Sequence, residues 1–137
     1  MVDPFFVALE LVFQPYVLLV IVCSGAFGLL VGSIPGLTAT MATALLVPVT
    51  FFMDPIPAIA AIVTTVATAI FAGDIPGALL RIPGTPASAA YCDEAFAMTR
   101  KGQAGQALGV GLTASVIGGL IGSTVLVFAT STLANFA

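Results

Sequence analysis

Two copies of a proline-glycine phrase, each followed by small hydroxyl side chains, are the part of this chain best suited to bind a solute. The copies read Ser33-Ile34-Pro35-Gly36-Leu37-Thr38-Ala39-Thr40 and Arg81-Ile82-Pro83-Gly84-Thr85-Pro86-Ala87-Ser88. In lipid, the backbone groups freed by such a break must be satisfied by protein, enclosed water or a ligand. Two breaks with nearby hydroxyls are what a carrier needs to hold a solute or an ion at membrane depth.

The two phrases together offer ligands for an anion and for a cation. A helix that begins after Pro-Gly directs N–H groups and its positive dipole end at the break, which favours a carboxylate. Carbonyls of unwound turns and hydroxyl oxygens suit a hard cation such as Na⁺. The alternative is that Pro-Gly only kinks helices for packing. A third copy of the tripeptide, Ile75-Pro76-Gly77, shows that Ile-Pro-Gly alone is weakly specific.

The composition is that of an integral membrane protein. Hydrophobic residues make up 60% of the chain and charged residues only 7%, whereas a soluble domain has about 25% charged residues. No charge occurs between Glu10 and Asp54 or after Lys101, and each stretch exceeds the about 20 residues of a helical span. The start lacks the basic leader of a signal peptide, so the first apolar segment is expected to be retained.

Several classes of function are disfavoured by the residues present. The chain has no basic patch for nucleic acid. It contains no histidine, and no base is evident near Ser24 or Ser115, so an intramembrane enzyme is disfavoured. No metal site and no cofactor are predicted.

Four apolar segments are predicted as helices, and they must position the phrases. They cover residues 12–33, 38–53, 58–72 and 107–133. The second is short for a full crossing and suits a half-helix or hairpin arm. The fold class is therefore all-α: a polytopic membrane protein with about four hydrophobic helical segments and two Pro-Gly-broken helices that allow a re-entrant path.

Small residues and charges refine this prediction. A packing face for close helix contact is expected at Ser24, Gly28, Gly32 and Gly36. The last apolar segment, rich in Gly and Ser, is expected to be tightly packed as well. Residues 89–105 form a polar connector, and its adjacent Arg100 and Lys101 favour the cytoplasmic side.

Two charged residues border the stretch that leads into the second phrase. Asp74 and Arg81 could form an interfacial salt bridge, or Arg81 could contact an anionic solute; both readings stay open.

The order and spacing of several motifs resemble the large membrane subunit of the tripartite tricarboxylate transporters. The similarity covers essentially the whole chain. The motifs are Gly32-Ser33-Ile34-Pro35-Gly36-Leu37, Leu45-Leu46-Val47-Pro48-Val49-Thr50, Ile82-Pro83-Gly84-Thr85-Pro86, Asp93, Lys101-Gly102-Gln103-Ala104-Gly105-Gln106-Ala107-Leu108-Gly109 and Gly118-Gly119. Two positions depart from the family pattern: Arg81 stands where Asn is frequent, and Glu94 stands where Gly is frequent.

The resemblance implies a secondary active transporter subunit in the bacterial inner membrane, not an enzyme. Such a subunit takes tri- or dicarboxylates from a periplasmic solute-binding protein, works with a small membrane subunit and couples uptake to Na⁺ or H⁺. The family's subunit is several times longer, so residues 1–137 are expected to be the N-terminal part of its transport domain and to need the remainder. The alternative is a non-transporting scaffold or pore-forming protein with kinked helices.

The resemblance also implies a set of site residues. One broken-helix arm would consist of Pro35, Gly36, Leu37, Thr38 and Thr40. The other would consist of Pro83, Gly84, Thr85 and Ser88, with Arg81 beside it. Asp74 and Asp93 are candidates for ion coupling or gating; for Asp93 the alternative is a solvated loop charge near Arg100 and Lys101.

Overall fold

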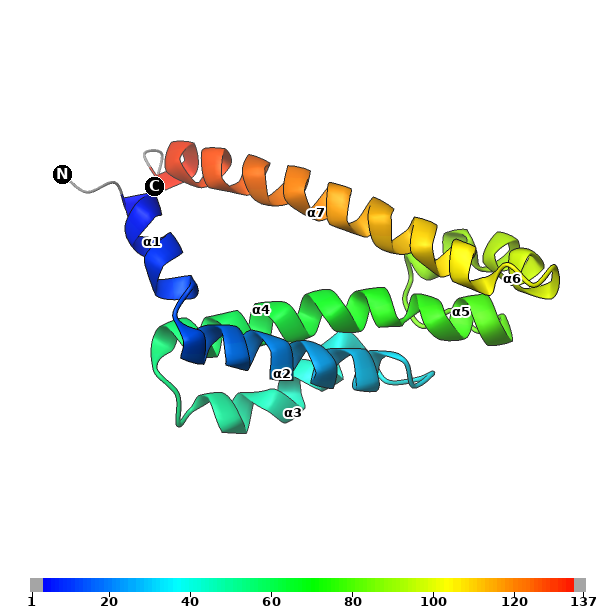
Figure 1. Ribbon diagram of the computed structural model, residues 1–137, viewed down its shortest axis with the longest axis horizontal. Helices are drawn as coiled ribbons and strands as arrows, with labels where there is room; N and C mark the ends of the chain where they lie inside the picture. Colours follow the sequence, from blue (N-terminus) through cyan, green and yellow to red (C-terminus); the bar gives the residue numbers. More distant parts are fainter. Residues whose placement is uncertain (1–3, 135–137) are drawn as a thin grey trace.

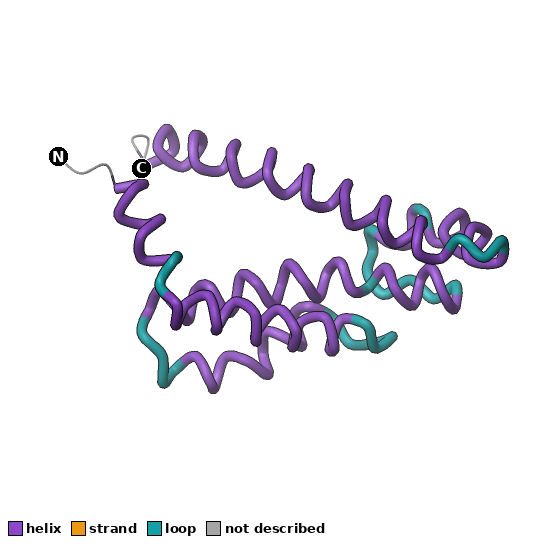
Figure 2. Tube along the Cα trace, viewed as in Figure 1, coloured by secondary structure: helices purple, strands orange, loops and turns teal. Residues whose placement is uncertain are grey.

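The computed structural model describes residues 4–134, and within this range the chain is helical between its turns and contains no strand (Figures 1 and 2). This confirms the all-α fold class. In chain order the elements are α1 (Pro4–Val12), α2 (Pro15–Gly32), α3 (Ala39–Thr50), α4 (Pro55–Ala72), α5 (Asp74–Leu80), a 3₁₀ turn (Ser88–Ala90), α6 (Cys92–Arg100) and α7 (Ala104–Ala134).

Three helical stretches of the described chain are long and apolar enough to cross a membrane. They are Pro15–Gly32, Pro55–Leu80 and Ala104–Thr130. The second joins α4 and α5. Helix α3 is also apolar but has only 12 residues, or about 18 Å of helix. A fourth crossing and a re-entrant path for the Pro-Gly helices therefore stay predictions.

Helices α2 and α4 run side by side in the same direction (Figure 1) and form the closest helix pair. A Cβ atom at Gly28 would lie 2.6 Å from the Thr65 carbonyl oxygen, and one at Gly32 would lie 2.6 Å from Ala69 Cα. The buried Thr65 hydroxyl also donates a 3.2 Å hydrogen bond to the Ser24 carbonyl. The predicted small-residue face is confirmed for Ser24, Gly28 and Gly32, because only small residues permit this approach.

The prediction was wrong for Gly36, the fourth residue of that face. Helix α2 ends at Gly32, and Gly36 lies in the following loop with a φ of +96°. Nothing lies within 4 Å of a Cβ atom placed there. The helix stops because proline at position 35 cannot continue its hydrogen-bond ladder, so the four-residue spacing no longer corresponds to one face.

The parallel course of α2 and α4 places both Pro-Gly phrases at the same end of this pair. The first phrase begins directly after Gly32, which contacts Ala69. The second phrase returns to the same region, since the Gly84 N–H donates a 3.2 Å hydrogen bond to the Gly73 carbonyl. Gly73 ends α4. The beginning of α2 and the beginning of α4 meet at the opposite end, where Val17 and Pro57 line a common cavity.

Three helices occur where the sequence predicted none: α1, α5 and α6. The connector predicted over residues 89–105 was wrong in part, because α6 occupies its middle. Asp93 and Glu94 lie in the first turn of α6 and Arg100 lies in the last, an arrangement that complements the helix dipole. Local charge order thus explains a helix that hydrophobicity alone does not indicate.

Helix α7 packs near its beginning against α5 and α6 and then diverges from α4 toward the other end of the molecule (Figure 1). None of its apolar span is buried within the described chain. A Cβ atom at Gly118, Gly119 or Gly122 would meet nothing within 4 Å. The tight packing predicted for this segment is therefore not seen among residues 4–134.

Candidate functional site

The second Pro-Gly phrase ends in a reciprocal pair of hydrogen bonds between Thr85 and Ser88. The Thr85 hydroxyl accepts from the Ser88 N–H at 3.1 Å, and the Ser88 hydroxyl oxygen accepts from the Thr85 N–H at 3.0 Å. The Ser88 hydroxyl donates in turn to the Thr85 carbonyl at 2.9 Å. This is a capping box with serine in the place of the usual glutamate, and it starts the helical turn before α6. Ser88 is fully buried.

Pro83 and Gly84 bring the phrase against the end of α4. A Cβ atom at Gly84 would lie 2.6 Å from the Gly73 carbonyl oxygen and 2.7 Å from Gly73 Cα. The Gly73 carbonyl lies at the junction of α4 and α5 and accepts from the Gly84 N–H. Glycine is therefore required at position 84 by a direct contact with backbone atoms. At position 73 it is favoured because a Cβ atom would lie 2.6 Å from Thr85 Cγ2. Neither glycine has a positive φ angle.

The first phrase forms the α2–α3 loop. Thr38 is the N-cap of α3 and accepts a 3.3 Å hydrogen bond from the Met41 N–H. Leu37 packs against a small core, whereas Pro35 and Gly36 are exposed. Thr40 is exposed and lines a cavity of about 490 Å³ between α3 and α4.

The two phrases are similar in sequence but differ in conformation. In each phrase a threonine begins the next helical turn. Thr85 follows Gly84 directly, whereas Leu37 separates Thr38 from Gly36. Gly36 has a positive φ and Gly84 does not. In both phrases a predicted ligand hydroxyl satisfies the protein's own backbone. An anion at the second phrase would have to compete for the N–H groups of Thr85 and Ser88.

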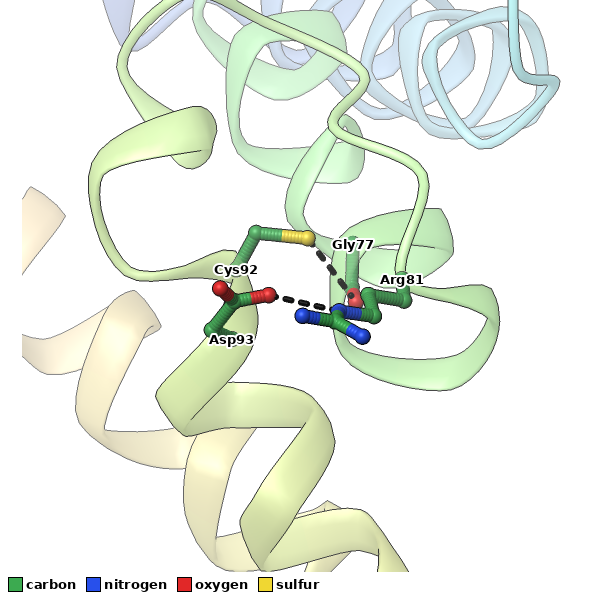
Figure 3. A network of polar contacts seen from close by, with 4 residues as sticks. All are labelled: Gly77, Arg81, Cys92 and Asp93. Carbon is green, nitrogen blue, oxygen red and sulfur yellow. Dashed lines mark hydrogen bonds and ion pairs between the residues drawn. The ribbon is translucent and has the colours of Figure 1, made fainter.

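Arg81 pairs with Asp93 rather than with Asp74. Its Nε lies 2.7 Å from Asp93 Oδ1, and both side chains are exposed. Figure 3 shows this ion pair beside a second link between the same helices, in which the Cys92 thiol donates to the Gly77 carbonyl at 3.4 Å. The suggested salt bridge between Asp74 and Arg81 is thus absent from the described chain.

The pairing changes the interpretation of both charges. Hydrogen bonding to Arg81 holds the pKa of Asp93 below its usual range. Asp93 is solvated, as one alternative held, but it lies in the first turn of α6 rather than in a loop, and it pairs with Arg81 rather than with Arg100 or Lys101. Arg81 itself adopts a left-handed conformation with φ of 60° at the C-terminal end of α5.

Asp74 is buried, and Tyr91 is its hydrogen-bond partner. Tyr91 donates a 2.6 Å hydrogen bond to Asp74 Oδ1 from the turn before α6. Burial is the main factor that raises the pKa of Tyr91 above its ordinary value, and the hydrogen bond to the Asp74 carboxylate raises it further. Asp74 Oδ2 faces α7, where it lies 3.3 Å from the position that a Cβ atom of Gly111 would take.

Sequence reasoning missed Tyr91 and Gly111. Both lie in segments predicted as a connector and a packing helix, and no local pattern marks either residue as a partner of Asp74. Their meeting depends on the way in which α5, α6 and α7 pack together.

The described geometry defines an all-helical membrane protein whose two Pro-Gly segments lie at one end of a tightly packed helix pair. Residues 18–137 match the model of the tripartite tricarboxylate transporter TctA family, and the chain belongs to this family. No solved structure matches the chain significantly.

A curated relative aligns with most of the chain. The chain is 33% identical over 110 residues to a protein of Agrobacterium vitis described as an uncharacterized 52.8 kDa protein in the TAR-I ttuC' 3' region. This alignment covers 80% of the present chain but 22% of the relative. The chain thus spans about a fifth of the length of this relative.

Proposed function

We propose that this chain is the N-terminal part of a secondary active transporter subunit that takes up tri- or dicarboxylates. Membership of the TctA family is the observation that carries the proposal. The site supports it, because two Pro-Gly segments lie at one end of the α2–α4 pair in a membrane-spanning chain. Irregular backbone at such positions is how many carriers build a substrate site.

The proposal includes partners and a driving force. A tripartite system has further components, and we propose that these are a small membrane subunit and a periplasmic solute-binding protein, with the remainder of the large subunit completing the site. We further propose that Na⁺ or H⁺ drives uptake across a bacterial inner membrane. Alternating access would move the carboxylate past the two Pro-Gly segments.

In the proposed site, backbone N–H groups and hydroxyls surround the carboxylate. One group of contributors follows α2: Pro35, Gly36, Leu37, Thr38 and Thr40. The other follows α5: Arg81, Pro83, Gly84, Thr85 and Ser88. Arg81 would attract the anion by its charge, and its exposed pair with Asp93 is of the kind that exchanges readily with a competing anion.

One observation favours a second candidate, a non-transporting scaffold with kinked helices. The hydroxyls of Thr38, Thr85 and Ser88 all cap backbone N–H groups. Such bonds are also what a purely structural turn requires.

Uptake of labelled carboxylates by vesicles that contain the complete transporter separates these two functions. We expect citrate or another carboxylate to accumulate under a Na⁺ or a proton gradient, and not when both gradients are absent. Absence of uptake for every carboxylate, with an intact complex and the binding protein present, would favour the scaffold.

The distribution of cations predicts how the chain lies in the membrane. All three Lys and Arg residues of the chain lie at the α5–α6 end (Figure 1): Arg81 after α5, and Arg100 and Lys101 after α6. The α3–α4 turn lies at the opposite end and carries Phe52, which is 93% exposed. Cations favour the cytoplasmic side, and aromatic side chains favour the membrane interface. We therefore expect the α5–α6 end on the cytoplasmic side and the α3–α4 turn on the external side.

Single cysteines test this orientation in the complete subunit. With Cys23, Cys92 and every cysteine in the remainder of the subunit replaced by serine, we expect an impermeant maleimide to label Phe52→Cys in intact cells and Lys101→Cys only after permeabilisation. The reverse pattern would show that the α5–α6 end is external.

A further inference from the structure

Asp74 differs from every other charged residue in the part of the chain whose side chains are described. It is 7% exposed, and the other buried polar side chains there are the neutral Ser24, Thr65 and Ser88. It is also the one charged residue of the Pro55–Leu80 candidate span. A charged side chain within such a span is costly in lipid and usually has a role in moving ions or substrate.

The surroundings of Asp74 hold its carboxylate but supply no positive charge. Tyr91 donates to Oδ1 at 2.6 Å, and Gly111 on α7 leaves room beside Oδ2. Arg81, the cation nearest to Asp74 in sequence, is paired with Asp93. Among the described residues, Asp74 therefore has a hydroxyl donor and no ion-pair partner.

The other charged groups on the surrounding helices do not change this balance. Glu94 on α6 lines a cavity of about 500 Å³ together with Tyr91 and Gly111, and it adds negative charge. Helix α7 carries no charged residue. On α4 the one charged group is Asp54, its N-cap residue, at the opposite end. Arg100, the cation of α6, lies in the last turn of that helix, and Arg81 is paired with Asp93. Among the described residues no cation therefore forms an ion pair with Asp74, and its carboxylate favours one.

We propose that Asp74 binds the monovalent cation, a proton or Na⁺, that couples to transport, and that the Tyr91 hydroxyl stabilises the carboxylate while the cation is absent. This rests on the proposed carrier function. It selects Asp74 over Asp93, whose carboxylate is exposed and already paired. Binding of a cation at Asp74 removes a net charge from the junction of α5, α6 and α7. The free energy of burying this junction therefore differs between the cation-bound and the empty form. Coupling requires such a difference.

Replacing Asp74 by asparagine in the complete transporter tests the proposal. Asparagine has nearly the shape of aspartic acid and is always neutral, so it mimics Asp74 with its charge removed. The carrier should then still exchange its carboxylate substrate across the membrane but should not use a cation gradient. We expect Asp74→Asn to lose gradient-driven accumulation while retaining exchange of labelled for unlabelled carboxylate. Asp54→Asn, the same change at the far end of α4, should retain both. Parallel assays with a Na⁺ gradient and with a proton gradient identify the cation.

Accumulation by Asp74→Asn at the wild-type level would overturn the proposal. A variant that lost both exchange and accumulation would leave the decision to Tyr91→Phe, which keeps the ring and removes the hydroxyl. Because that hydroxyl competes with the cation for Oδ1, we expect its loss to lower the cation concentration for half-maximal uptake by roughly tenfold, with the KM for carboxylate unchanged. An unchanged cation dependence would overturn the proposal.

If the wild-type transporter moves no carboxylate at all, the proposed carrier function itself fails. This result differs from the failure of the Asp74 proposal, in which the wild-type transporter is active.

Discussion

Replacing Gly32 by valine is expected to separate α2 from α4 and to unfold this part of the subunit. The added Cβ atom would lie within 2.6 Å of Ala69 Cα and still closer to the Ala69 carbonyl oxygen. Because these are backbone atoms of a neighbouring helix, no rotamer change relieves the contact. We expect a loss of about 3 kcal/mol, the upper end of the range for overpacked cores. Thermal unfolding of the purified subunit in detergent measures it.

The matched control for this prediction lies on the same helix. At Gly25 the added Cβ atom would meet Thr64 Cγ2 at 3.4 Å and Thr68 Cγ2 at 3.7 Å, which are ordinary contacts with side chains. Alanine is also the better helix former, by about 1 kcal/mol. Gly25→Ala should therefore be neutral or stabilising. Equal losses in Gly25→Ala and Gly32→Val would show that the backbone contact with Ala69 does not hold the helix pair together.

The sequence predicted the long helices and the small-residue contact because both depend on local patterns. A hydrophobic stretch of sufficient length becomes a helix in lipid whatever surrounds it. Ser24, Gly28 and Gly32 recur at helical spacing, so their common face is determined before tertiary structure forms. Even the hydroxyl of Thr68 behaves as its position in a helix predicts, since it donates to the Thr64 carbonyl at 2.8 Å.

The site was less predictable because its contacts join distant parts of the chain. One of two open readings paired Arg81 with Asp74, but the partner of Arg81 is Asp93 and the partner of Asp74 is Tyr91. Sequence spacing alone could not separate these pairings, because α5 ends in the left-handed Arg81 and the chain reverses there. The two phrases are similar in sequence, yet their conformations differ. The contact of Gly84 with Gly73 has no counterpart at Gly36, which is exposed.

Replacing Gly84 by alanine is the second change with a large expected effect, and it acts on transport. Its Cβ atom would lie 2.6 Å from the Gly73 carbonyl oxygen, so the second phrase must move away and lose the hydrogen bond between Gly84 and Gly73. A displacement of about 1 Å at a positioned site can cost about 100-fold in rate. We expect gradient-driven carboxylate uptake by the complete transporter to fall below about a tenth of wild type, by the same reasoning.

Gly77→Ala is the control that separates a change at the phrase from general damage to this region. Gly77 lies in α5, where an added Cβ atom would meet Cys92 Sγ at 3.7 Å and the Ile82 carbonyl oxygen at 4.0 Å. Both distances are ordinary contacts, so uptake should stay near the wild-type level. If Gly84→Ala transports as well as Gly77→Ala at equal expression, the second Pro-Gly segment does not lie on the substrate path. A loss confined to Gly84→Ala, with the subunit still folded, would favour a carrier in which the junction of α4 and α5 holds the substrate-binding segment in place.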